Sequence, residues 1–425
     1  MINKNSIAAV DAAGWSKSFV RPLYGSYCFS GIPATVERLL TGRSAGSPLP
    51  TDVLGPLPQQ YQKVVLFLVD AFGWRFFERW RDEFPFLKQL SERGVVSKIT
   101  SIFPSTTAVH VTALHTGLTL KQSGVCEWYY YDPAIDAVIA PLLFSYHKSN
   151  KRNSLLAAGR VPEEVLPTSE LYPRLKTAGV DSYVFQDGAY AQSPYSRVVC
   201  RGSRIVAYQS LADGFRKLCK ILRSANSPSY FVYYFDRFDA VCHEKGPGSK
   251  QAETRAREFF ESLEQKFFAE LGESPDTLFL LTADHGQVEQ DPESVYLLDR
   301  EWPELVDCLK KTAAGEPIAP AGSQRDYFLY VEPQHLDHVQ ARLAADLEGR
   351  AEVYRVEELE AAGMFGPGEA SLDFQEHMGN LLVLPYADEA VYWGGPTGEP
   401  EFTFRGHHGG LARGEMESVL VAWSL

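Results

Sequence analysis

The sequence has no closely spaced pair of cysteines and no apolar run long enough to cross a membrane. Its six cysteines are widely spaced and none forms a C-x-x-C pair. Free thiols in a reducing compartment are the favoured interpretation, although an even number leaves disulfides open. No apolar stretch reaches the roughly 20 residues that a membrane span needs, and the first residues lack the basic and apolar regions of a signal peptide. We therefore expect a soluble, cytoplasmic protein without a membrane partner.

Positive charge is also scarce. The 425 residues include 41 lysines and arginines against 54 acidic residues, and no Lys/Arg-rich run offsets the net charge of −13. This balance argues against a nucleic-acid polymer as partner, because its phosphates require cations. An acidic protein that handles phosphates needs local positive charge, and bound metal ions are one source of it.

The chain has no internal repeat or low-complexity tract, and its 45% hydrophobic and 22% charged residues are typical of a globular protein. Residues 1–60 contain six prolines and several glycines, and we expect them to form a loosely structured lead-in that wraps the core. Residues 61–425 are expected to form one domain with insertions at about 126–226 and 295–400. The first insertion has one clear strand signal, at 182–185.

Three apolar runs, 63–69, 228–235 and 277–282, have the pattern of strands buried on both faces. A further strand is expected over 95–103, and helices over 74–93 and 251–271. The alternation of strands and helices predicts an α/β/α sandwich with a central, mostly parallel sheet and inserted cap regions. Ligands of such sheets gather beyond the carboxyl ends of the strands.

Acidic and imidazole side chains follow each of the three runs. Asp70 directly follows the first, and Asp239 with His243 lies just beyond the second. Asp284-His285 ends the third, and Gly286 permits the turn that a shared ion would require. Each pattern also has an ordinary alternative: a helix N-cap for Asp70, or a local hydrogen bond for Asp239 and His243, which share a helix face at i and i+4. Each alternative is enough to explain one position by itself. Together they do not explain why ligand-type residues follow every major strand.

The stretch from Phe103 to Gly117 leads from a strand into a helix. Ser105, Thr106 and Thr107 therefore lie where a nucleophile can meet an anion at a helix N-terminus. Thr106 and Thr107 are also compatible with ordinary capping roles. Near the end of the chain His408 occupies a glycine-rich turn, where a surface-loop histidine is the alternative to a metal ligand.

These motifs together resemble the alkaline phosphatase superfamily, and most closely its type I phosphodiesterase/nucleotide pyrophosphatase branch, over roughly residues 62–425. The motifs that carry the resemblance are Val69-Asp70-Ala71-Phe72-Gly73, Phe103-Pro104-Ser105-Thr106-Thr107 with Thr116-Gly117, Asp239-x-x-x-His243-x-x-Gly246-Pro247, Thr282-Ala283-Asp284-His285-Gly286 and Gly406-x-His408-Gly409-Gly410.

The resemblance implies two divalent metal ions and a threonine nucleophile. It assigns one ion to Asp239, His243 and His408 and the other to Asp70, Asp284 and His285, with Thr107 as the nucleophile that coordinates the second ion. It implies hydrolysis of phosphodiester or pyrophosphate bonds in a small molecule or nucleotide through a covalent phospho-threonine. Mixed Asp/His ligands suit zinc, and manganese or iron is compatible with the same ligand types.

Two positions depart from the family pattern. Ala108 follows the nucleophile where the family usually has a base-stacking aromatic, and Glu127-Trp128 lies where it has a phosphoryl-contacting asparagine. Trp128 and the following tyrosines could replace the aromatic surface, or pack in the core. Open alternatives are a phosphomonoesterase, for which Lys121 and Arg197 are candidate phosphate ligands, a phosphoglycerate-mutase-like phosphotransferase, and a non-catalytic metal-binding protein.

Overall fold

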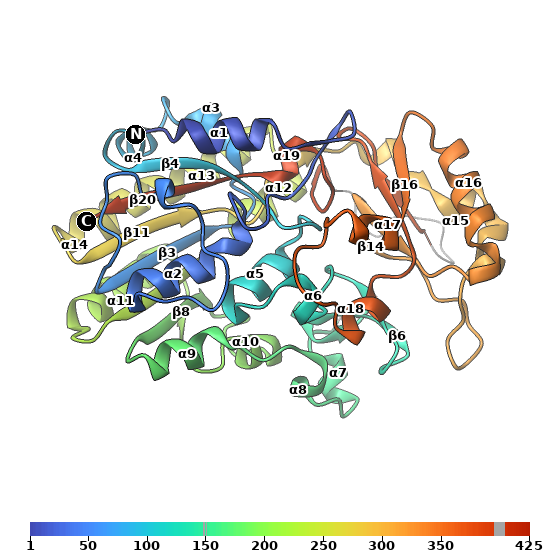
Figure 1. Ribbon diagram of the computed structural model, residues 1–425, viewed down its shortest axis with the longest axis horizontal. Coiled ribbons are helices and arrows are strands. Elements are labelled where there is room, and N and C mark those ends of the chain that lie inside the picture. Colours follow the sequence, from blue (N-terminus) through green and yellow to red (C-terminus); the bar gives the residue numbers. More distant parts are fainter. Residues whose placement is uncertain (148, 150, 395–403) are drawn as a thin grey trace.

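The computed structural model describes residues 1–147, 149, 151–394 and 404–425 (Figure 1). Its centre is a seven-stranded sheet with strand order β4-β20-β11-β3-β10-β8-β9. β20 runs antiparallel to both of its neighbours, β11 and β4, whereas the pairs from β11 to β9 are parallel. The strands are β3 (Lys63–Val69), β4 (Val95–Thr100), β8 (Asp181–Asp187), β9 (Arg204–Tyr208), β10 (Ser229–Phe235), β11 (Thr277–Thr282) and β20 (Glu417–Ser424).

Helices cover both faces of this sheet. The side chains of β3 alternate between two apolar clusters: Val64, Leu66 and Leu68 face one, and the residues between them face the other. The first face is covered by α2 (Ile32–Thr41), α5 (Thr107–Thr116), α9 (Leu171–Thr177) and α10 (Pro194–Val199). The second is covered by α3 (Trp74–Trp80), α4 (Pro85–Arg93), α11 (Leu211–Ser224), α12 (Arg237–Lys245) and α13 (Lys250–Leu263). The predicted α/β/α sandwich with a mostly parallel sheet is therefore confirmed.

Residues 1–60 are more ordered than their proline content suggested. They contain α1 (Lys4–Asp11), the hairpin β1 (Gly14–Trp15) and β2 (Phe19–Val20), and helix α2. Helix α1 packs against β4, and α2 contributes Ile32, Val36 and Leu39 to the core. Pro33 lies in the first turn of α2, where the missing N–H has no helical partner to lose, so it does not interrupt the helix.

The stretch 126–226 divides into two parts. Its first part forms a separate small sheet of β5 (Tyr130–Asp132), β6 (Ala137–Ala140) and β7 (Ser145–Tyr146), followed by α7 (Ser154–Ala157) and α8 (Pro162–Val165). In its second part, β8 and β9 extend the main sheet beyond β10. Only the first part therefore lies outside the sandwich.

A second, smaller lobe is built on the sheet β14-β15-β17-β16 and lies at the right of Figure 1. We call it the small lobe. Its main elements are β14 (Ala321–Ser323), β15 (Asp326–Leu329), α16 (Leu336–Asp346), β16 (Ala351–Arg355) and β17 (Leu381–Pro385). The remaining short elements of the chain are α6 (Leu120–Ser123), α14 (Ala269–Leu271), β12 (Val288–Glu289), β13 (Tyr296–Leu297), α15 (Leu298–Glu301), α17 (Val356–Ala361), α18 (Leu372–His377), β18 (Val391–Tyr392), β19 (Gly406–His407) and α19 (Arg413–Met416).

A buried ion pair joins the small lobe to the C-terminal segment. Arg325 donates to Glu415 through Nε (2.9 Å) and Nη2 (3.0 Å), and both side chains are fully buried. Glu415 also accepts from the backbone N–H groups of Gly410 and Ala412. The pair therefore ties the loop that contains His408 to the small lobe.

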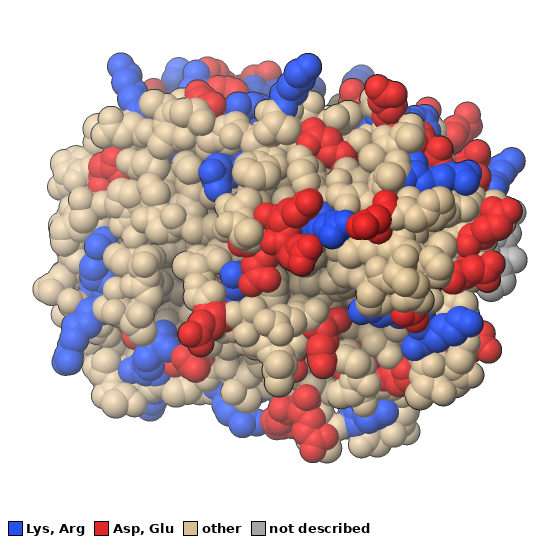
Figure 2. All heavy atoms as spheres, turned by 45° about the vertical axis from the view of Figure 1, so that its right-hand side comes forward, with Lys and Arg blue, Asp and Glu red and all other residues tan. Residues whose placement is uncertain are grey.

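The outer surface has no continuous basic band among the described residues on the face that Figure 2 shows, where acidic and basic side chains alternate. Within the described chain, no helix has both the length and the apolar character that a membrane crossing requires. All six cysteines are described, buried and free of disulfide bonds.

We predict that Arg325→Met lowers the free energy of unfolding by about 3–5 kcal/mol, because Glu415 is left as an unpaired buried charge. Urea denaturation monitored by circular dichroism measures the loss. Arg342→Met is the matched control, since its pair with Asp346 is exposed on α16 and exposed pairs contribute less than about 1 kcal/mol. Equal, small losses in both variants would contradict the structural role of the pair.

Candidate metal centre

The predicted site residues come together beyond the carboxyl ends of three adjacent strands. Asp70 follows β3, Asp284 follows β11, and α12 carries Asp239 just after β10. Because β10, β3 and β11 are parallel neighbours, these side chains emerge at one edge of the sheet. Thr107 reaches the same edge as the first residue of α5, and His408 arrives from the loop after β19.

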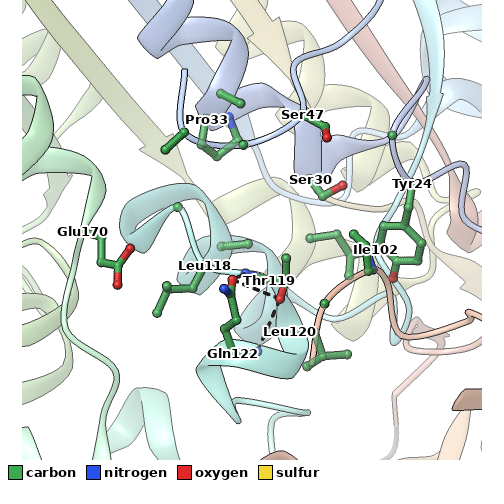
Figure 3. A pocket seen from close by; sticks show the side chains of 18 of the residues that line it. Tyr24, Ser30, Pro33, Ser47, Ile102, Leu118, Thr119, Leu120, Gln122 and Glu170 are labelled. Carbon is green, nitrogen blue, oxygen red and sulfur yellow. Dashed lines mark hydrogen bonds between the residues drawn. The ribbon is translucent and has the colours of Figure 1, made fainter. Parts of the chain in front are cut away.

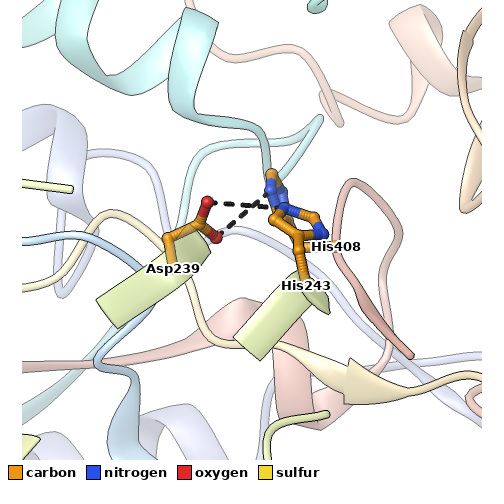
Figure 4. A group of neighbouring side chains, drawn as sticks. All are labelled: Asp239, His243 and His408. Atoms are coloured by element: carbon orange, nitrogen blue, oxygen red, sulfur yellow. Dashed lines mark ion pairs between the residues drawn. The ribbon is translucent and has the colours of Figure 1, made fainter. Parts of the chain in front are cut away.

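The first cluster consists of Asp239, His243 and His408 (Figure 4). One potential ligand atom from each lies within 4.8 Å of the others. Asp239 and His243 are one helical turn apart on α12, with 3.4 Å between Oδ2 and Nε2. His408 Nε2 approaches Asp239 Oδ1 at 3.7 Å from the opposite loop. The i and i+4 spacing therefore does place both side chains on one face, with the third group added by the tertiary fold.

The second cluster consists of Asp70, Asp284 and His285, which are at most 2% exposed. His285 Nε2 lies 3.5 Å from Asp70 Oδ1 and 3.4 Å from Asp284 Oδ2. The two clusters adjoin, because the imidazole rings of His285 and His408 stack with centroids 3.7 Å apart. Thr107 Oγ1 lies beside the second cluster, 3.1 Å from His285 Nε2 and 3.5 Å from Asp70 Oδ1.

Backbone carbonyls orient all three imidazoles in the same way. The Nδ1 atoms of His243, His285 and His408 lie 2.8, 3.0 and 2.9 Å from the carbonyl oxygens of Gly406, Gly286 and Ser105. A carbonyl only accepts, so each Nδ1 carries a proton, and in the neutral ring Nε2 presents a lone pair to the carboxylates. Burial lowers the pKa of His285 to about 4 and that of His408 well below its usual value, which keeps both rings neutral.

The carboxylates of the two clusters repel one another. Burial, then Asp284 and then Asp239, raises the pKa of Asp70 well above its usual value. Among the described residues, no lysine or arginine forms an ion pair with these three carboxylates, and of the side chains that could carry positive charge only the cluster histidines approach them. Asp284 Oδ2 is buried without a hydrogen-bond donor, although its Oδ1 accepts from the N–H groups of Ala71 and His285. Carboxylate oxygens and neutral imidazoles around an unfilled acceptor are a donor set that fits divalent cations.

Gly286 has a different role from the one that the sequence suggested. Its φ angle is not in the left-handed region, so the turn itself does not require glycine. A Cβ at this position would instead overlap the carbonyl oxygen of Gly414, and one at Gly73 would meet Gly286. Glycine is needed here because three backbone segments approach one another closely next to the second cluster.

Thr107 opens onto a cavity of about 200 Å³ that also contacts Asp70 and Asp239. Its lining also includes Trp128, Gln186, Tyr190 and Tyr195, together with the exposed Arg152. Gln186 is 4% exposed and its Oε1 is buried without a hydrogen-bond partner. Gln186 and the two tyrosines were not predicted from the sequence, because they lie in the stretch of the chain with the least regular pattern. The only local signal was the end of the strand at 182–185.

The other residues considered as phosphate or base contacts lie elsewhere. Lys121 is buried in an ion pair with Glu360, and Arg197 is exposed on α10 outside the cavity. Tyr130 is buried and stacks on His377, so of the aromatic run only Trp128 faces the cavity. A larger cavity of about 310 Å³ lies at the other end of α5, between the N-terminal segment and the loop that contains Thr119 (Figure 3). It contains none of the predicted site residues.

Comparisons with known proteins agree with this geometry. The profile of the type I phosphodiesterase/nucleotide pyrophosphatase family matches residues 64–411. A search of curated proteins finds no significant match. Among solved structures, murine ectonucleotide pyrophosphatase/phosphodiesterase 5 is 17% identical, with a TM-score of 0.62 over 85% of this chain and 88% of that one. An inactive variant of the same murine protein, in complex with AMP, is 16% identical, with a TM-score of 0.61 over 85% and 88% of the two chains.

Phosphonoacetate hydrolase from Sinorhizobium meliloti 1021, in complex with phosphonoformate, is 16% identical, with a TM-score of 0.59 over 84% of this chain and 89% of that one. At these identities the similarity establishes the fold alone. Together with the family match, it confirms the predicted alkaline-phosphatase-like architecture.

We predict that Asp70→Asn stabilises the chelator-treated protein at pH 8. A carboxyl whose pKa is raised by folding destabilises the native state at every pH above its unfolded pKa, because the unfolded chain then releases the proton more readily than the native protein does. The variant carries no titrating carboxyl at this position, so it is expected to unfold at a higher temperature than the wild type at pH 8. The gain shrinks as pH falls and Asp70 takes up its proton.

Thermal unfolding in the presence of chelator at pH 5 and pH 8 provides the measurement. Asp82→Asn, which changes an exposed carboxylate, is the control and is expected to have little effect. A chelated Asp70→Asn protein that unfolds at a lower temperature than the chelated wild type at pH 8 would rule out this account of the cluster.

Proposed function

Because the chain belongs to the type I phosphodiesterase/nucleotide pyrophosphatase family, we propose that it is a two-metal hydrolase that cleaves phosphodiester or pyrophosphate bonds through a covalent phospho-threonine. The observation that carries this proposal is the position of the Thr107 hydroxyl. It lies at a helix N-terminus, beside two adjoining Asp/His clusters and at the mouth of a cavity.

In this proposal Asp239, His243 and His408 hold one divalent ion, and Asp70, Asp284 and His285 hold the other together with Thr107. Ions bound there would supply the positive charge that stabilises a threonine alkoxide and the phosphoryl oxygens. The mixed ligand set favours zinc, and manganese is compatible with it. The acidic chain offers no alternative cation inside the clusters among its described residues.

Groups of the chain itself bind the phosphate and attack the phosphorus atom. The N-cap residue Thr106 makes no side-chain capping bond, so the first N–H groups of α5 are available to a phosphate. A bond forms between Thr107 Oγ1 and phosphorus while the ester oxygen of the leaving group departs with its electron pair. Water then bonds to phosphorus, and Thr107 Oγ1 departs and regains a proton.

The cavity favours a diester over a monoester. A monoester carries an additional charge that calls for a cation near the nucleophile, and the one Lys or Arg among the described lining residues, Arg152, is exposed. The apolar and aromatic lining instead suits an uncharged organic group esterified to the phosphate, which we call the substrate arm. Since Ala108 is fully buried and supplies no stacking surface, Trp128, Tyr190 and Tyr195 are the aromatic groups available to that arm.

We predict that Thr107→Ala lowers kcat for bis-p-nitrophenyl phosphate by about 10³-fold or more in the zinc- or manganese-loaded protein, because the nucleophile is removed. Thr107→Ser keeps a hydroxyl at the same atom and is expected to retain measurable turnover. Thr106→Ala is the matched neighbour and is expected to stay within about tenfold of the wild type. The wild type is expected to hydrolyse p-nitrophenyl phosphate more slowly than the diester.

Metal analysis of each variant separates loss of the nucleophile from loss of the ions. An undiminished rate in Thr107→Ala would eliminate Thr107 as the nucleophile. Fewer than two ions per chain in the wild type, with no hydrolysis of the diester, would favour the non-catalytic metal-binding protein. A preference for the monoester would overturn the diesterase assignment.

We further predict that Gln186 contributes to substrate preference. Gln186 lines the cavity and its buried Oε1 lacks a donor, so a rotation of the amide toward the cavity lets an arm with an N–H group gain a hydrogen bond of about 1 kcal/mol there. The test compares thymidine 5′-(p-nitrophenyl phosphate) with methyl p-nitrophenyl phosphate, which have the same leaving group. Gln186→Leu is expected to reduce the ratio of their kcat/KM values about 5- to 10-fold while the methyl ester keeps its rate. A ratio unaffected by the substitution would exclude this contact.

A further inference from the structure

We propose that Ser105 and His110 form a clamp that positions Thr107 relative to the two Asp/His clusters. The inference rests on the proposed function. Ser105 connects the nucleophile loop to the loop of His408, and His110 fixes the turn that leads into α5. Both are positioning residues, because neither lines the cavity beside Thr107.

Ser105 is fully buried and directs all of its polar groups to residues 408–410. Its N–H donates to Gly409 O (3.0 Å), and its carbonyl oxygen accepts from His408 Nδ1 (2.9 Å). Its hydroxyl donates to Gly410 O (2.7 Å) and accepts from Gly409 N (3.2 Å). Four hydrogen bonds thus connect two loops that are about 300 residues apart in the chain, and Thr107 is only two residues further along.

The opposite side of the His408 loop is held independently. Ser323 Oγ donates to His408 O at 3.1 Å from the small lobe. Gly409 adopts a φ of 131° against Ser323 and Asp326, where a Cβ would overlap both side chains. The loop therefore lies between Ser105 and Ser323, so removal of the Ser105 hydroxyl loosens one side without releasing the other.

His110 uses both ring nitrogens to close the turn between β4 and α5. Nε2 accepts from Ile102 N (2.9 Å) and Nδ1 donates to Thr106 O (2.7 Å). A backbone N–H can only donate, so this neutral tautomer is the one that satisfies both partners. The ring is fully buried, with Phe29 against it at a centroid distance of 4.8 Å. One side chain therefore holds both ends of the segment 102–106 and fixes the carbonyl directly before Thr107.

The two halves of the clamp act on different parts of the site. The Ser105 hydroxyl supports the residues next to His408, which belongs to the first cluster. His110 supports the turn before Thr107 and makes no hydrogen bond to the His408 loop among the described residues. Substitution of Ser105 is therefore expected to change ion retention, and substitution of His110 to change the rate of the chemical step.

The test uses full-length, zinc-loaded protein with three variants: Ser105→Ala, His110→Leu and His110→Asn. Ion content is measured during titration with a competing chelator, and kcat and KM are measured with bis-p-nitrophenyl phosphate. Ser105→Ala is expected to release one of its two ions about 10- to 100-fold more readily than the wild type, the usual effect of losing support behind a metal ligand. The second ion is expected to be retained as in the wild type.

His110→Leu is expected to keep both ions and a similar KM while kcat falls about 10- to 100-fold, because small misplacements of a nucleophile have effects of this size. His110→Asn retains a donor near the position of Nδ1 and is expected to recover part of the loss. Matched controls are Ser229→Ala, whose buried hydroxyl bonds Ser227 O, and His377→Leu, whose buried Nδ1 bonds Gly124 O. Both are expected to leave ion release and kcat unchanged.

A wild type without two ions and without hydrolysis would overturn the proposed function, and the clamp with it. With an active, two-ion wild type, unchanged ion release in Ser105→Ala or unchanged kcat in His110→Leu would overturn the clamp alone. If His110→Leu does not fold, as judged by circular dichroism, His110→Asn decides: a wild-type kcat would overturn the role of His110, and an intermediate kcat with both ions bound would support it.

Discussion

Three carboxylates gathered at one edge of a parallel sheet, two of them buried and one half-buried, are the constraint on which the rest of this structure depends. Asp70, Asp239 and Asp284 reach that edge because β3, β10 and β11 are parallel neighbours, and burial together with repulsion from the other two carboxylates raises the pKa of Asp70. Such an arrangement is tolerable only if a cation completes it or a proton is retained. The buried Oδ2 of Asp284 accepts no hydrogen bond from the described residues and is the acceptor that such a cation would bind.

The imidazoles around these carboxylates are oriented to complete the same cation-binding clusters. Each histidine of the two clusters uses Nδ1–H on a backbone carbonyl, so that Nε2 faces the acids. The carbonyls belong to Gly286, Gly406 and Ser105, which lie in three different segments of the chain. Orientation of the ligand rings therefore depends on how these loops pack, and the close approach of Gly73, Gly286 and Gly414 shows how little space the packing leaves.

The substrate side of the site is built from a different part of the chain. Much of the cavity wall beside Thr107 comes from the end of β8, from α10 and from the segments before β8 that carry Trp128 and Arg152. The family relationship extends over this region, yet Ala108 and Glu127 depart from the family pattern. Neither of these two residues lines the cavity.

The sequence by itself predicted the sandwich, since buried strands with acids after them are patterns of neighbouring residues, and its resemblance to the family singled out Thr107 and the six residues that the structure gathers into two clusters. It did not determine that 1–60 contains ordered helices, that β8 and β9 extend the sheet, or that Gln186 faces the cavity. It also left open which groups support His408 and Thr107. Those features were decided by the tertiary structure, because each depends on contacts such as Ser105 with Gly410 or Arg325 with Glu415, whose partners are far apart in the chain.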